Sequence, residues 1–208
     1  AIPTFSVIGN HDHNESVKND TDSDADFRNV LGPTYYSVNI GDYHMVVLDD
    51  VLYSGATGRN DYANTITQEQ LDWLKKDLSY VSKDKGLIVA LHIPTARWNK
   101  LNNLTNTQAL YDLIKDFDNV QIISGHAHNQ STVEIAPNMT EYNFAAAMGA
   151  YWYPLCSDGT PRGYGMLKFN GNKLVDVKYK SAGYPDDFQM KIYAPKDAVL
   201  CKPGNNAG

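Results

Sequence analysis

Three short apolar runs, each followed at once by a polar turn that carries histidine, constrain this 208-residue chain more than any other feature. The runs are Phe5–Ile8, Leu87–Leu91 and Val120–Ile123. A short continuous apolar run bounded by turn residues predicts a strand that is buried on both faces. Such strands are typical of parallel sheets, in which the carboxyl ends of neighbouring strands meet at one ligand-binding crevice. The pattern therefore predicts an α/β fold with a histidine-lined site at one edge of the sheet.

Five side chains that can ligate a metal ion follow these runs directly: Asn10, His11, His92, His126 and His128. Taken singly, each has a plainer explanation. A lone histidine at a strand end is usually a structural hydrogen-bond partner, and an asparagine in a glycine turn is usually a turn residue. Their joint occurrence after three predicted strands favours a common ligand site instead.

The rest of the chain alternates helical and strand patterns. Thr67 begins a helix whose leucines recur at three- to four-residue spacing, and a second helix is predicted over residues 105–117. Helices between apolar strands imply right-handed crossovers in a partly parallel sheet. We also expect a hairpin over residues 35–49, a long loop over residues 50–66 and alternating strands after residue 130.

Charge and composition exclude several classes of protein. The net charge of −6 argues against a general nucleic-acid binder, which would carry a basic surface. It also disfavours an anionic substrate unless a bound cation reverses the local field. No apolar run approaches the roughly 20 residues that span a bilayer, so no transmembrane segment is expected. Cys156 and Cys201 are either one bridge or two buried thiols.

With these motifs in place, the chain resembles the calcineurin-like metallophosphoesterases. Gly9-Asn10-His11-Asp12 is similar to the family's G-N-H-D/E block, and His92 to its single-histidine block. Gly125-His126-Ala127-His128 is similar to its G-H-x-H block, and the resemblance covers roughly residues 5–180 in the same order. It implies a four-layer α/β/β/α sandwich with the site at one edge of two packed sheets.

The resemblance also implies roles for single residues. A centre of two divalent or trivalent metal ions (Mn, Fe or Zn) would activate a hydroxide that attacks phosphorus. The metal ligands would be Asn10, His92 and His126 for one ion and His128 for the other. His11 would stabilise or protonate the phosphoryl oxygen or the leaving group, and Asp12 would orient His11. Apart from the resemblance, the loop after His92 should overhang the site, so its residues Arg97 and Trp98 are expected to contact the substrate.

Two ligand blocks of the family, D-x-H and G-D-x-x-D, normally precede G-N-H-D, but only eight residues precede Gly9. Asp42-Tyr43-His44 has the letters D-x-H, but it lies in the predicted hairpin and is not expected to substitute. We therefore expect residues 1–182 to be a partial metallophosphoesterase domain that lacks its first strands. Residues 183–208 would be a linker or the beginning of a C-terminal β domain. Alone, this fragment would hold one metal ion or none and be inactive or mononuclear.

Some residues near the motifs have two open interpretations. Asp49 and Asp50 end a predicted strand, and they either point toward the cleft or form a solvated strand end. His13 either lies at the rim of the site or has a structural role. The aromatic residues 151–153 either form an apolar or sugar-stacking wall or simply pack a loop.

The parent protein is thus expected to be a phosphatase or phosphodiesterase. Its substrate would be a phosphate-ester small molecule or a phosphorylated glycan or lipid, with no nucleic acid as partner. Segments 32–37 and 160–164 of the chain are similar to the corresponding segments in a subset of the family. In that subset small N- and C-terminal β domains flank the catalytic domain, and the proteins tend to be exported to the periplasm, the cell surface or the medium. The alternative is a non-catalytic module that binds a glycan or a protein on the same scaffold.

Overall fold

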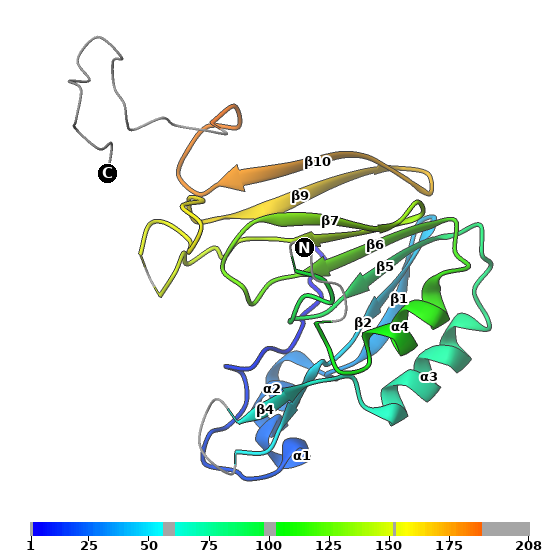
Figure 1. Cartoon of the computed structure of the whole chain (residues 1–208), viewed down its shortest axis with the longest axis vertical. Coiled ribbons are helices and arrows are strands. Elements are labelled where there is room, and N and C mark those ends of the chain that lie inside the picture. Colours follow the sequence, from blue (N-terminus) through cyan, green and yellow to red (C-terminus); the bar gives the residue numbers. More distant parts are fainter. Residues whose placement is uncertain (1, 56–60, 98–102, 152, 189–208) are drawn as a thin grey trace, which may run out of the picture.

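The computed structural model of the chain describes residues 2–55, 61–97, 103–151 and 153–188 (Figure 1). Its main element is a six-stranded mixed sheet with the order β1-β2-β5-β6-β8-β7. The four inner strands run parallel, and the two outer strands run antiparallel to their neighbours. The strands are β1 (Tyr36–Ile40), β2 (Tyr43–Val47), β5 (Gly86–Ala90), β6 (Asn119–Ser124), β7 (Ser131–Ala136) and β8 (Met139–Asn143).

Two helices, α3 (Gln68–Leu78) and α4 (Thr107–Ile114), lie side by side against one face of this sheet (Figure 1). Helix α3 begins where predicted, because the Thr67 side chain accepts a hydrogen bond from the Gln70 amide and caps the first turn. Leu74 and Ile114 are fully buried in one apolar cluster with the inner strands. The predicted second helix is confirmed, with shorter bounds.

A second, two-stranded sheet of β9 (Gly163–Asn170) and β10 (Lys173–Ser181) packs on the opposite face. Tyr43 and His44 are neighbours on β2, so their side chains point to opposite faces. The His44 Nε2 atom lies 2.7 Å from the Asp77 carboxylate of α3. On the other face, the centroids of the Tyr43 ring and the Phe169 ring of β9 lie 4.4 Å apart. Helices, main sheet and second sheet are therefore stacked as α/β/β layers, which confirms the predicted α/β fold, and among the described residues no second helical layer covers β9 and β10.

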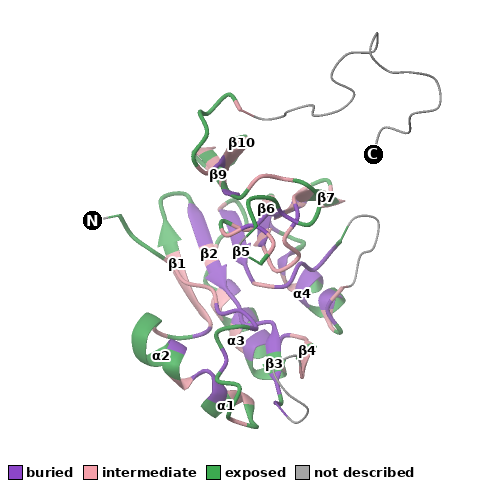
Figure 2. Ribbon diagram, turned by 90° about the vertical axis from the view of Figure 1, so that its left-hand side faces the viewer, coloured by how far each residue is buried: buried purple, intermediate pink, exposed green. Residues whose placement is uncertain are grey.

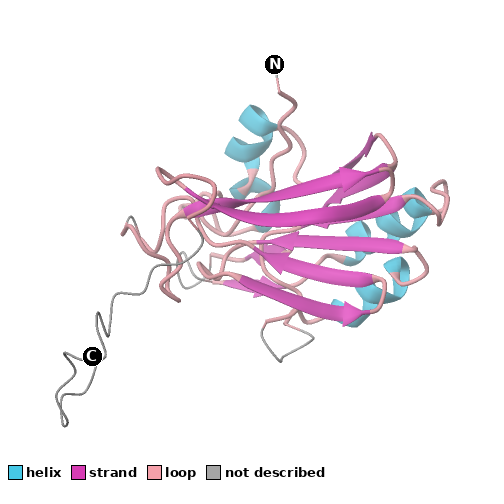
Figure 3. Cartoon of the chain, turned by 90° about the horizontal axis from the view of Figure 1, so that it is seen from above, coloured by secondary structure: helices cyan, strands magenta, loops and turns pink. Residues whose placement is uncertain are grey.

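Burial follows this layering. Figure 2 shows β2 and β5 largely buried in the middle of the molecule, whereas much of α2 (Ala25–Leu31) is exposed. Every residue of β5 is buried, as expected for a strand covered on both faces. Figure 3 shows the strands running side by side when the molecule is viewed from above. None of the helices in the described ranges is both long and apolar enough to cross a membrane.

Two expectations about local structure are wrong. Phe5–Ile8 is not a strand, because none of the described strands pairs with it; it is held instead by the buried Ile8 and by the Tyr36 hydroxyl, which donates to the Ser6 carbonyl. Residues 50–66 are not a continuous loop, since they contain the antiparallel strands β3 (Val51–Tyr53) and β4 (Tyr62–Asn64). Tyr53 is fully buried beside the short helix α1 (Asp20–Ser23), so tertiary packing outweighs the glycine signals there.

Nothing in the structure tests whether the two cysteines pair. Cys156 is buried, and its thiol donates to the Ala146 carbonyl at 3.7 Å, while burial raises the pKa of that thiol. Cys201 lies outside the described residues. Most of the predicted strand Phe188–Tyr193 also lies outside them.

Candidate functional site

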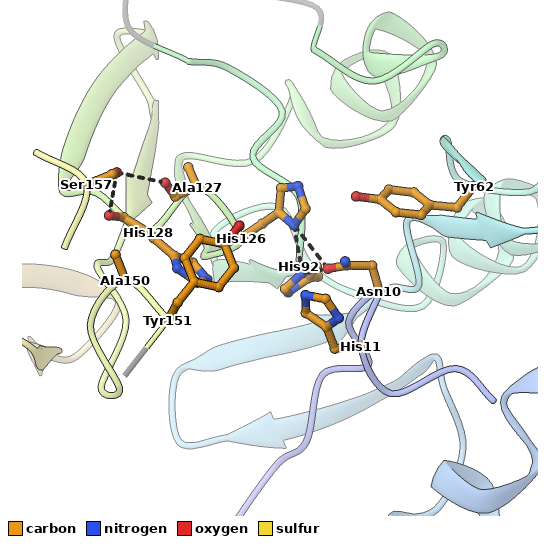
Figure 4. Close-up of a pocket in the computed structure, with 10 residues that line it drawn as sticks. All are labelled: Asn10, His11, Tyr62, His92, His126, Ala127, His128, Ala150, Tyr151 and Ser157. Atoms are coloured by element: carbon orange, nitrogen blue, oxygen red, sulfur yellow. Dashed lines mark hydrogen bonds between the residues drawn. The ribbon is translucent and has the colours of Figure 1, made fainter. Parts of the chain in front are cut away.

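The two histidine turns that follow β5 and β6 lie side by side at one edge of the sheet. The two strands are parallel neighbours with Ala90 opposite Ile123, so His92 and His126 emerge at the same end. The Gly125 amide donates to the His92 carbonyl at 3.0 Å and joins the two turns directly. The turn that carries Asn10 meets them from the amino-terminal segment (Figure 4). The predicted convergence of the three motifs is therefore observed.

Three polar atoms form a small triangle at the centre of this site. Asn10 Oδ1 lies 2.8 Å from His92 Nε2 and 3.2 Å from His126 Nδ1, and the two ring nitrogens lie 3.0 Å apart. Neighbouring ligands of an octahedral metal ion, each about 2.1 Å from it, are about 3.0 Å apart. The triangle therefore has the size of one face of a metal coordination shell.

Burial keeps these imidazoles neutral. Burial, with a smaller contribution from the neighbouring His126 and His11, lowers the pKa of His92 to about 3. The pKa of His126 is also lowered, mainly by burial and then by His128. A neutral imidazole has a free lone pair, which is the form that binds a metal ion.

The backbone around the triangle is closely packed and locally strained. A Cβ atom at Gly9 would lie 2.8 Å from the His92 ring, so only glycine allows this approach. His126 and His128 have φ angles of 60° and 51°, in the left-handed region that residues other than glycine rarely adopt. Strained backbone of this kind persists where the surrounding structure holds it and is concentrated at functional sites.

The triangle forms the floor of a cavity of about 380 Å³ (Figure 4). The cavity is lined by Asn10, His11, Tyr62, His92, His126, Ala127, His128, Ala150, Tyr151 and Ser157. The Tyr62 ring stands edge-on to His126 at 6.4 Å, and the Tyr151 ring lies 5.7 Å from His128. Two tyrosines on different segments thus stand next to the histidines at the cavity walls.

The remaining predicted site residues are placed as follows. His11 is exposed on the cavity wall beside Asn10. The Asp12 carboxylate accepts the Gly9 amide at 2.8 Å and closes the turn; no hydrogen bond joins it to His11 in the described ranges, so its orienting role stays a prediction. Arg97 is exposed and close enough to His126 to lower the pKa of that ring, and Trp98 lies outside the described residues.

Several neighbouring residues do not have the roles that their positions suggested. Asp50 is not a solvated strand end, because it is fully buried and accepts the amides of His92 and Ile93 at 3.2 and 2.8 Å. His13 is not at the rim, because it is buried against Tyr53 and its ring bonds the Ser23 hydroxyl. Asp42-Tyr43-His44 is remote from the site, as expected, because it lies at the opposite end of β2, where Tyr43 pairs with Gly86, the first residue of β5.

Sequence reasoning missed Tyr62 and Ser157 on the cavity wall and the buried Glu141, which is not among the residues that line the cavity. No local signal marks these residues, because each reaches the site through tertiary packing. The described residues hold no group of three or more His, Cys, Asp or Glu side chains arranged to bind a metal ion. The triangle differs from such a group in that its third donor is an asparagine oxygen.

Two family models match the chain. One, described as calcineurin-like phosphoesterase, matches residues 1–130, and one described as the C terminal of calcineurin-like phosphoesterase matches residues 141–202. No curated protein matches the chain. The first match covers well over half of the 208 residues and includes all three histidine-bearing turns. The chain belongs to the calcineurin-like phosphoesterase family.

Proposed function

We propose that this protein hydrolyses phosphoesters and that Asn10, His92 and His126 hold a metal ion on which the reaction depends. Membership of the family implies phosphoester hydrolysis, and the family is metal-dependent in general. The observation that carries the proposal for this chain is the triangle of one amide oxygen and two imidazole nitrogens, with edges of 2.8 to 3.2 Å.

The donor set fits a metal ion of the first transition series. Imidazole nitrogen with oxygen suits Mn, Fe or Zn, and the two imidazoles are kept neutral by burial, so binding requires little proton release. The amide oxygen of Asn10 is neutral as well, so these three ligands leave the full charge of the cation available to an anionic substrate. When bound, such an ion supplies positive charge to phosphate oxygens and lowers the pKa of a coordinated water.

The side chains around the triangle divide the remaining tasks. His11 is exposed on the cavity wall, where it would donate a hydrogen bond or a proton to the phosphoryl or leaving-group oxygen. Asp12 fixes the turn that carries His11 by accepting the Gly9 amide. Arg97 would add positive charge near His126, and Trp98 remains a proposed substrate contact.

We propose that the parent protein and the 208-residue chain bind different numbers of metal ions. Besides the triangle, His128 is the other predicted ligand on the cavity wall. A second ion would need more donors than His128 offers, so the dinuclear centre is proposed for the parent protein with its additional ligand blocks. The 208-residue chain is proposed to bind a single ion and to be essentially inactive.

The proposed substrate is a small phosphate ester or a phosphorylated glycan or lipid, in a protein that we propose to be exported. The net charge of −6 disfavours an anionic ligand in the absence of a cation, which is consistent with substrate binding that depends on metal. Tyr62 and Tyr151 offer ring faces beside the histidines for a sugar or an aromatic leaving group.

The test compares the full-length parent protein with this chain in the presence of Mn²⁺. p-Nitrophenyl phosphate reports monoester hydrolysis, and bis(p-nitrophenyl) phosphate reports diester hydrolysis. We expect the parent protein to hydrolyse one of them and to lose that activity with EDTA, while the 208-residue chain binds Mn²⁺ with little turnover. A metal-loaded parent protein that hydrolyses neither ester would overturn the proposal in favour of a binding module.

A further inference from the structure

A buried carboxylate on β8 lies behind the two histidine turns. Glu141 is 1% exposed, and its side chain accepts four hydrogen bonds. Its Oε1 atom accepts the Thr95 amide at 3.0 Å and the Ser124 hydroxyl at 2.6 Å. Its Oε2 atom accepts the Ala96 amide at 2.8 Å and the Thr95 hydroxyl at 2.5 Å. Both oxygens are therefore occupied by donors.

These donors belong to the two segments that carry the imidazoles of the triangle. Thr95 and Ala96 follow His92 by three and four residues, and Ser124 precedes His126 by two. Each carboxylate oxygen of Glu141 accepts from the segment after His92, and Oε1 also accepts from the segment before His126. One side chain, which is not among the residues that line the cavity, thus connects both segments.

The donors around Glu141 require a hydrogen-bond acceptor at both oxygens of its side chain. Two of the four donors are backbone amides, which cannot reverse direction. Since the Thr95 hydroxyl donates to Glu141, the Tyr111 hydroxyl, 2.8 Å from Thr95 Oγ1, donates in turn to Thr95. None of the ion pairs in the described ranges involves Glu141, so these donors are what compensates its burial.

The backbone bond from the Gly125 amide to the His92 carbonyl also joins the two turns, whereas two other buried side chains each hold one turn. Asp50 accepts the amides of His92 and Ile93, and so it fixes the first part of one turn only. Asn143, two residues after Glu141 on β8, donates to the Ser124 hydroxyl and to the Gly125 carbonyl, and so it supports only the other turn. Of these three buried side chains, Glu141 is the one that bonds both segments.

We propose that Glu141 is a positioning residue, whose buried carboxylate sets the spacing of the His92 and His126 rings before any ligand binds. The carboxylate holds the segment 95–96 and Ser124 together, and the two rings are carried on the same segments with their nitrogens 3.0 Å apart. The value of this spacing for metal binding rests on the proposed function. The spacing itself does not, because it is a property of the metal-free protein.

The test uses Glu141→Gln in the 208-residue chain. Glutamine keeps the shape of the side chain, but its NH₂ group faces donors and cannot accept them. Isothermal titration with Mn²⁺ should give an affinity about 10- to 100-fold weaker than that of the wild type, as is common when a group that supports a metal ligand is altered. In the metal-free protein, the ¹⁵N chemical shifts of the His92 and His126 rings should move, because their mutual hydrogen bonding changes.

Ile114→Ala is the matched control for lost stability. Ile114 is fully buried on α4 and belongs to the apolar core, so the substitution lowers Tm without touching either turn. We expect its Mn²⁺ affinity to stay within twofold of the wild-type value. The ¹⁵N shifts of its histidine rings should equal those of the wild type within error. If Glu141→Gln does not fold, Ser124→Ala takes its place in the test. It removes only one of the four donors to Glu141, and we expect it to weaken Mn²⁺ binding several-fold.

The outcomes separate this proposal from the proposed function. Unchanged ring shifts and unchanged Mn²⁺ affinity in a folded Glu141→Gln variant, or effects no larger than those of Ile114→Ala, would refute the positioning role. If Glu141→Gln does not fold, wild-type shifts in Ser124→Ala would refute it. If the wild-type chain binds no Mn²⁺, the metal site fails, and the ring shifts of the metal-free variants alone decide the role of Glu141.

Discussion

The Nε2 atom of His92 lies 3.0 Å from the Nδ1 atom of His126, although the two residues are 34 positions apart in the chain. This contact exists because β5 and β6 are parallel neighbours whose carboxyl ends both turn toward Asn10. Two imidazoles that burial keeps neutral, with an amide oxygen beside them, make a site that is suited to a cation.

The ligand roles predict a separation between metal binding and turnover. His126→Ala should weaken Mn²⁺ binding by at least about tenfold, because it removes one donor of the triangle. His11→Ala should leave Mn²⁺ affinity unchanged, since His11 stands on the wall, and should lower kcat in the parent protein by about 100-fold or more. Calorimetry and steady-state assays measure the two effects. Loss of metal in His11→Ala would show that the assignment of roles is wrong.

Asp50 should contribute to stability through the two amides that it accepts. In Asp50→Asn the NH₂ group faces one of the amides of His92 and Ile93, which leaves a buried donor unpaired. We expect the free energy of unfolding to fall by about 1–3 kcal/mol. Urea denaturation followed by circular dichroism measures the change. Asp84→Asn is the control on an exposed carboxylate, and equal stability of the two variants would contradict the role of Asp50.

Asp49 should make stability depend on pH. Burial, together with the nearby charges of Asp20 and Asp24, raises its pKa from 3.8 to about 7. Between those two pH values the folded protein keeps a proton that the unfolded chain has lost, so this group stabilises the fold below about pH 4 and the contribution is lost as the pH rises toward 7.

The difference between the wild type and Asp49→Asn isolates this group from other titrating residues. Relative to the variant, the wild type should lose on the order of a few kcal/mol of unfolding free energy between pH 4 and pH 7. Thermal or urea unfolding across this range measures it. Parallel curves for the two proteins would contradict the raised pKa of Asp49.

The tyrosines at the cavity walls should act on substrate binding. Tyr62→Ala and Tyr151→Ala should each raise KM for a phosphoester with an aromatic or sugar leaving group by about 5- to 30-fold, with a smaller effect for glycerol phosphate. Steady-state kinetics of the parent protein measure the ratio. Tyr80→Ala is the control, since Tyr80 is exposed and is not among the residues that line the cavity. Equal effects on both substrates would exclude stacking.

Much of this fold was predictable because its signals are local. The Thr67 side chain caps the first turn of α3, and the apolar run Leu87–Leu91 is the buried strand β5 with both of its ends one residue earlier. Parallel pairing then brings the ends of β5 and β6 together as a matter of geometry, so the convergence of His92 and His126 followed from sequence alone.

Other parts depend on contacts that leave no trace in local sequence. Phe5–Ile8 has the apolar pattern of a strand, but a strand also needs a partner, and none of the described strands provides one. Glu141 has the alternating pattern of an ordinary strand, and only the fold shows that its carboxylate meets Thr95 and Ser124. Tyr62 reaches the cavity because β3 and β4 pair within a segment whose glycines predicted a loop.

Anomalous diffraction from crystals of the 208-residue chain grown with Mn²⁺ tests the central claim most directly. The account predicts one strong Mn²⁺ peak about 2.1–2.3 Å from Asn10 Oδ1, His92 Nε2 and His126 Nδ1. A peak bound by other side chains, or a site with these three atoms in their present hydrogen-bonded arrangement and no metal at saturating Mn²⁺, would contradict it.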